Sequence, residues 1–186
     1  MMADKITLLQ DKRVSFVGEY SMSDINLSIT DEIRSYCEQN LCGQYGKNWA
    51  CPPYVPSVDI CRGIVGRYQN MILFRTTFPR KDVFDLMEMY NAAKEHQRLT
   101  SMVRDEFSSI FEGKFLILGA GGCGNCEKCS CPDGSCVDPK RKINSIESYA
   151  IDLDSFLLEN NISRRGGNEE QSFFTMIFYR PVSGSS

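Results

Sequence analysis

The chain has a single histidine, no long apolar run and no surplus of positive charge, and each shortage excludes a class of protein. With one histidine, His96, no Ser/His/Asp arrangement can be proposed around it. No stretch approaches the roughly 18 apolar residues of a membrane span, and the first residues lack the apolar region of a secretory signal. A net charge of -3 argues against a nucleic-acid binder. We expect a cytoplasmic protein that binds neither membrane nor nucleic acid.

Nine cysteines are the main feature that remains. They are too few for a disulfide scaffold, and an odd number cannot all pair with one another. A chain of 186 residues buries a sizeable core without crosslinks. In a reducing compartment, clustered cysteines are more often metal ligands or redox groups. The amino-terminal group comprises Cys37, Cys42, Cys51 and Cys61. The carboxy-terminal group comprises Cys123, Cys126, Cys129, Cys131 and Cys136.

The rest of the sequence predicts an α/β (α+β) fold in one domain, residues 1–186, with two cysteine-rich metal-binding loops. Strand patterns occur at residues 13–20, 71–74, 114–118 and 172–179. Helical spacing occurs after an N-cap at Ser28 or Thr30, and over residues 57–68, 81–111 and 146–158. Because each amphipathic helix must bury its apolar stripe, we expect a sandwich of helices on a sheet of about four or five strands. Gly18 is expected at a bulge, and His96 in the core.

The carboxy-terminal group has the spacing of iron–sulfur ligands. Cys123, Cys126 and Cys129 form C-x2-C-x2-C, with which bacterial ferredoxins hold one cluster. Cys136 is favoured as the fourth ligand because six further residues let the chain return to the open corner. Cys131 keeps a claim through the Cys-Pro that ends ferredoxin motifs. A structural zinc site is the alternative, since four thiolates at tetrahedral corners suit zinc equally well.

The amino-terminal group is looser. Cys37, Cys42 and Cys51 follow C-x4-C-x8-C, and the prolines after Cys51 stiffen a loop, which predicts a second cluster. Cys61 lies on helical spacing and is as consistent with a small core residue as with a ligand. Three thiolates would leave one iron open to substrate, whereas a fourth ligand would close the cluster for electron transfer. The sequence leaves both arrangements open.

Taken together, the two signatures resemble the uncharacterised "predicted metal-binding protein" family of bacteria and archaea. The resemblance covers nearly the whole chain and is carried by residues 45–53 after Cys37 and Cys42, by residues 119–136, and by residues 139, 146–147 and 151–152. It implies a small cytoplasmic protein, frequent in anaerobes, that binds iron–sulfur or another metal through these cysteines and has no settled reaction. The family's Cys-x2-Cys-x2-Cys-x6-Cys matches Cys123 to Cys136 and leaves Cys131 as an extra cysteine.

These patterns favour an iron–sulfur redox module over a stand-alone enzyme. We expect one or two [4Fe-4S] clusters that pass single electrons to a redox partner protein. A structural zinc-binding scaffold or interaction protein is the main alternative, and an enzyme with an open-iron cluster is a further one. Gly119, Gly121 and Gly124 match a dinucleotide-binding G-x-G-x-x-G, but the motif runs into cysteines instead of opening a helix.

Overall fold

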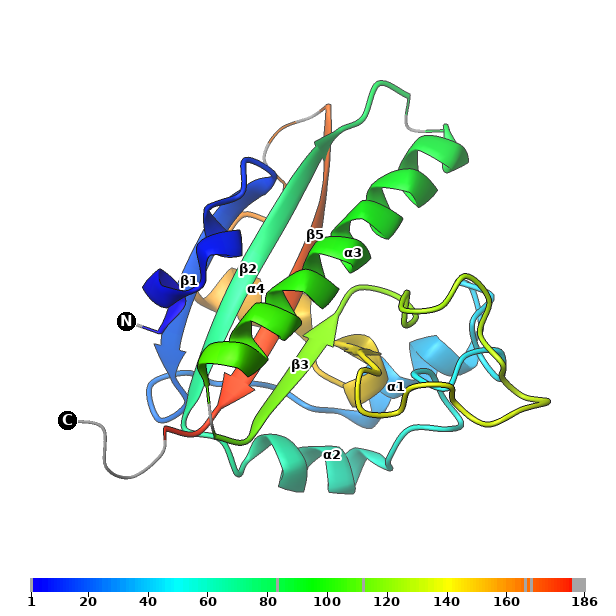
Figure 1. The fold of residues 1–186 in the computed structure, drawn as a ribbon, viewed down its shortest axis with the longest axis horizontal. Helices are drawn as coiled ribbons and strands as arrows, with labels where there is room; N and C mark the ends of the chain where they lie inside the picture. Colours follow the sequence, from blue (N-terminus) through cyan, green and yellow to red (C-terminus); the bar gives the residue numbers. More distant parts are fainter. Residues whose placement is uncertain (1, 83, 112, 166, 168, 182–186) are drawn as a thin grey trace.

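The computed structural model describes residues 2–82, 84–111, 113–165, 167 and 169–181 (Figure 1). Its centre is a five-stranded sheet of order β1-β2-β5-β3-β4. The strands are β1 (Val14–Ser21), β2 (Asn70–Pro79), β3 (Phe115–Gly119), β4 (Asn144–Ser145) and β5 (Glu170–Tyr179). Neighbouring strands pair antiparallel except β3 and β4, which pair parallel. The predicted α+β fold and the size of its sheet are confirmed.

Three of the four described α-helices begin after a polar side chain that caps them. The described helices are α1 (Asp31–Glu38), α2 (Val58–Val65), α3 (Leu86–Ile110) and α4 (Leu153–Glu159), with short 3-10 turns η1 (Ala3–Lys5), η2 (Thr7–Gln10) and η3 (Glu147–Tyr149). The Thr30 hydroxyl accepts the Ile33 N–H, which confirms the predicted cap. Asp85 caps α3, so this helix begins after the predicted residue 81. No described helix is long and apolar enough to cross a membrane.

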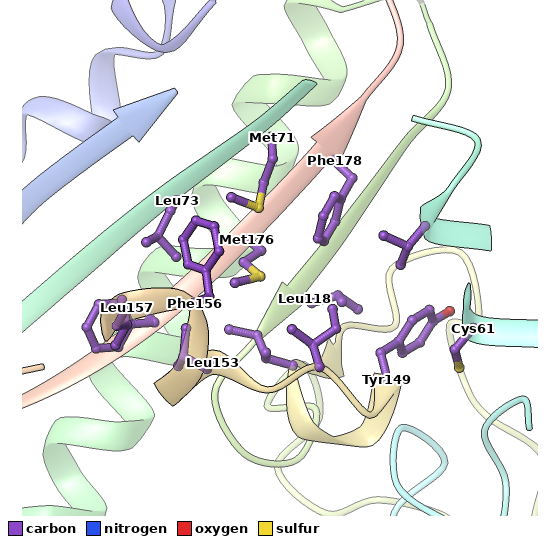
Figure 2. Close-up of a cluster of buried hydrophobic side chains, with 14 residues drawn as sticks. Cys61, Met71, Leu73, Leu118, Tyr149, Leu153, Phe156, Leu157, Met176 and Phe178 are labelled. Carbon is purple, nitrogen blue, oxygen red and sulfur yellow. The ribbon is translucent and has the colours of Figure 1, made fainter. Parts of the chain in front are cut away.

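The sheet carries an apolar core on each of its faces. Successive residues of β2 point to opposite faces, so Ile72 and Phe74 join one core while Met71 and Leu73 join the other. On the first face α3 contributes Leu99, Val103 and Phe107 (Figure 1). On the second face α2, η3 and α4 contribute Cys61, Tyr149, Leu153, Phe156 and Leu157 (Figure 2). We call the sheet and the helices that pack on its two faces the sheet body.

Helix α3 confirms the predicted position of His96 but not the whole predicted apolar stripe. His96 is fully buried, its Nδ1 lies 2.7 Å from Thr76 Oγ1, and burial lowers its pKa to about 4. Leu86 and Met89, at the start of the stripe, are instead 70% and 40% exposed. The apolar spacing of α3 therefore continues past the part of the helix that the sheet covers.

Two local predictions were wrong because tertiary pairing overrides local spacing. Residues 146–158 do not form one helix: Ala150 adopts a left-handed φ of 61°, and Ile151 pairs with Ile29 in an isolated bridge. The bulge in β1 lies between Val14 and Phe16, while Gly18 pairs regularly with Leu73. Gly18 instead leaves room for the side chain of Tyr20, because a Cβ at position 18 would lie 2.5 Å from the Tyr20 hydroxyl.

Candidate metal centre

Two loops, one from each cysteine group, lie side by side beyond the carboxyl end of β3 (Figure 1). We call residues 39–57 the amino-terminal cysteine loop and residues 120–142 the carboxy-terminal cysteine loop. Helix α1 delivers Cys37 just before the first loop, and β3 leads directly into the second. The ends of regular elements therefore position both groups.

The amino-terminal cysteine loop folds back on itself through left-handed turns. Asn40, Gly43 and Gly46 have φ values of 56°, 71° and 68°, a conformation that asparagine and glycine adopt at low cost. The Asn40 side chain accepts the Tyr45 N–H at 3.0 Å, and the Gly46 N–H donates to the Pro52 carbonyl at 2.9 Å. These turns bring Cys51 back toward Cys37 and Cys42 despite the eight residues between Cys42 and Cys51.

Polar side chains of one cysteine loop bond to the backbone of the other. The Asn48 amide donates to the carbonyl of Cys123 at 3.4 Å, and the Trp49 indole N–H donates to the Gly134 carbonyl at 3.0 Å. In the opposite direction, the Cys131 thiol donates to the Gly46 carbonyl at 3.6 Å, and the Lys142 ammonium donates to the Trp49 carbonyl at 3.1 Å. The loops therefore form one joined unit.

Helix α3 fixes the carboxy-terminal loop to the sheet body. The Gln97 amide nitrogen donates to the carbonyls of Ala120 and Gly122 at 3.3 and 2.8 Å. The Ser101 hydroxyl donates to the Asn125 side chain at 2.7 Å. Gly124 packs so closely on Gln97 that a Cβ there would collide with it. The cavity between α3 and this glycine-rich turn holds about 10 Å³, room for no more than a water molecule.

Burial and neighbouring thiols raise the pKa values of Cys37, Cys51 and Cys126. Burial first, then Cys42, Cys37, Cys123 and Cys129, raises the pKa of the Cys51 thiol to about 12. Burial, then Glu147 and Cys42, raises the pKa of Cys37 to about 11, against the opposing effect of Arg34. Partial loss of solvent, then Cys123, Cys129 and Cys136, raises the pKa of Cys126. The seven predicted ligands outside the core, called the seven-thiol set below, are Cys37, Cys42, Cys51, Cys123, Cys126, Cys129 and Cys136.

The other two cysteines lie in different surroundings. Cys61 is fully buried in the core beside Tyr149, and its sulfur lies 3.5 Å from the Pro56 carbonyl and 3.7 Å from the Arg34 guanidinium (Figure 2). Its pKa is raised by burial, against the opposing Arg34. Cys131 is buried under the amino-terminal cysteine loop, and its pKa is raised by burial and then by Cys129. Cys131 thus borders the seven-thiol set, whereas Cys61 belongs to the core.

The donor set fits a metal that prefers sulfur. Within the described part of the chain, no three His, Cys, Asp or Glu side chains are arranged to hold a single metal ion. The gathered side chains are thiols, which suit iron–sulfur clusters and zinc. A nearby cation favours the thiolate form and would oppose the raised pKa values of Cys37 and Cys51.

Sequence reasoning missed the residues that hold the loops in place. Asn48 and Trp49 lie within the family-like segment 45–53, so the resemblance gave a signal for them without a role. The sequence gave no signal for Gln97 and Ser101, because polar residues are common on the solvent side of a helical pattern. Glu147, which acts on Cys37, was read only as part of the resemblance.

Comparison with known proteins gives one match. The model of a family described as "Predicted metal-binding protein" matches residues 21–179, a span that contains all nine cysteines. No curated protein and no solved structure matches the chain.

Proposed function

Because the chain belongs to the predicted metal-binding protein family, we propose that its cysteine loops bind iron–sulfur, as [4Fe-4S], and that it transfers electrons to a redox partner protein in the cytoplasm. The observation that carries the proposal is the sulfur-rich donor set: two loops that bond to each other and that, with Cys37, supply the seven-thiol set. The single histidine is engaged in the core. Seven thiols exceed the four that one structural zinc ion takes, and they match the thiolate ligation of iron–sulfur clusters.

The chain's own residues would hold the group and set its surroundings. When bound, the cluster supplies a one-electron couple whose potential depends on hydrogen bonds, burial and charge. Cys51 is buried, while Cys42 and Cys126 are exposed, so the site has an inner side and an edge that a partner protein can reach. Trp49 and Tyr54 pack on each other beside Cys51 in the sequence, with ring centroids 4.5 Å apart.

A structural zinc-binding role is the second candidate. The observation that favours it is the number of bonds between the loops, since a metal that only closes loops would strengthen the same contacts. Cys123, Cys126, Cys129 and Cys136 would suffice for one tetrahedral zinc ion. The two candidates differ in whether inorganic sulfide is present.

Anaerobic purification of the full chain tests the proposal. We expect a brown protein with broad absorption near roughly 400 nm and matching amounts of iron and acid-labile sulfide. Cys126→Ser should lose iron and colour, whereas Ser135→Ala, an exposed change in the same loop, should keep both. A colourless protein with stoichiometric zinc and no sulfide would refute the redox role and favour the zinc scaffold.

A further inference from the structure

We infer that the two cysteine loops form one composite metal–thiolate centre, in which Cys51 shares a site with Cys123 and Cys129. The inference rests on the proposed metal binding but goes beyond it, because sequence spacing divides the same cysteines into two separate sites. The ligand class is a polynuclear metal–thiolate group, since seven thiols exceed the four that one tetrahedral ion takes.

The first argument is the bonding between the loops. Asn48, three residues before Cys51, bonds to the backbone carbonyl of Cys123. A Cβ on Gly122 would lie 2.7 Å from the same Asn48 amide, so the two backbones approach as closely as glycine allows. The loops meet at the cysteines themselves and not only at their far ends.

The second argument is the position of Cys51 within its own loop. The Cys51 N–H donates to the Asn48 carbonyl at 2.9 Å, so Cys51 lies one turn from the side chain that bonds to Cys123. The Trp49 carbonyl, between Asn48 and Cys51, accepts from the Lys142 ammonium at 3.1 Å. Cys51 is 7% exposed and is therefore buried where its loop is bonded to the carboxy-terminal cysteine loop.

The test is whether a change in one loop empties the other. Cys42→Ser removes an exposed thiol of the amino-terminal group, so the sheet body keeps its packing; Cys51→Ser removes the central one. The full chain is purified anaerobically, metal per chain is measured, and alkylation of Cys126 and Cys136 is followed by peptide mass spectrometry. Lys47→Ala, an exposed change in the same loop, is the matched control.

In a composite centre, Cys51→Ser and Cys42→Ser lose metal from both loops, and Cys126 and Cys136 are alkylated as fast as in metal-free protein. If Cys126 and Cys136 in these variants stay as protected from alkylation as in the wild type, and only the metal of the amino-terminal loop is lost, the inference is overturned. The proposed function then still stands. If the wild-type chain carries zinc instead of iron and sulfide, the proposed function fails, and the same alkylation comparison still decides the inference. A wild-type chain in which iron, zinc and cobalt protect none of these thiols overturns both.

Discussion

The sheet body and the cysteine loops are stabilised by different interactions. In the sheet body, fully buried apolar side chains such as Phe74, Phe107 and Phe178 cover both faces of the strands. In the loops, the main contacts are single hydrogen bonds from side chains such as Asn48 and Trp49 to backbone carbonyls. Apolar burial contributes far more free energy than a net hydrogen bond of about 1 kcal/mol. Apolar burial therefore supplies most of the stability of the body, whereas the loops depend on hydrogen bonds and on the metal proposed above.

The dependence between the two regions runs in one direction. Gln97 and Ser101 on α3 hold the carboxy-terminal cysteine loop, and Asn144 in β4 holds the amino-terminal one through the Ala50 carbonyl at 3.1 Å. All three belong to regular elements of the sheet body. Damage to the body should thus disturb the loops when the body unfolds, whereas damage to the loops should leave the body folded.

The largest effect expected is from Phe107→Ala. Phe107 is fully buried and packs against Phe111, Phe115 and Tyr179 with ring centroids 5.0 to 5.8 Å apart. Its truncation should lower the free energy of unfolding by about 3–5 kcal/mol, because it removes apolar contacts and leaves a cavity. Chemical denaturation measures this, with the exposed Ser108→Ala on the same helix as control. Metal content per folded chain should not change; a loss of metal without a loss of stability would contradict the comparison.

The sheet body was largely predictable because its signals are local and repeated. Four of the strands were found from β-branched and aromatic runs, and α3 from its three- and four-residue apolar spacing. Strand β4, at residues Asn144–Ser145, is too short to carry a pattern. The break at Ala150 depends on the pairing of Ile29 with Ile151, a contact between distant segments that local spacing does not contain.

The candidate site was predictable in its residues but not in its arrangement. C-x2-C-x2-C identifies Cys123, Cys126 and Cys129 as a group because two intervening residues suit a shared centre. The approach of Cys51 to that group depends on left-handed turns at Gly43 and Gly46 and on the Asn48 bond to Cys123. None of these features changes the spacing of cysteines along the chain. The sequence therefore shows two separate groups, and only the structure shows that their loops bond to each other.

The second-largest effect expected is a loss of stability of the sheet body as the pH falls, caused by His96. Burial lowers the pKa of His96 from 6.5 to about 4, so the unfolded chain binds a proton more readily than the folded one between these values. Stability due to the neutral histidine is present above pH 6.5 and is lost as the pH falls toward 4, by roughly 3 kcal/mol. Denaturation of metal-free protein at several pH values should show this loss, and it should be smaller in His96→Gln, which cannot titrate. Equal pH dependence in both proteins would show that His96 does not cause it.

The smallest effect should appear in Gln97→Met, which keeps the length of the side chain but removes both bonds to Ala120 and Gly122. Each net hydrogen bond contributes about 0.5–1.5 kcal/mol, so the loop should open more readily by about 1–2 kcal/mol. Amide hydrogen exchange in residues 120–126 should then rise roughly 5- to 30-fold, while exchange in β2 and β5 stays unchanged. Ser108→Ala should alter neither region. Faster exchange across β2 and β5 as well would mean that Gln97 supports the whole body, and the division between an independently folded sheet and metal-completed loops would fail at α3. If exchange is faster only in the loop, and added metal slows it again, the Gln97 side chain marks the boundary between the sheet body and the carboxy-terminal cysteine loop.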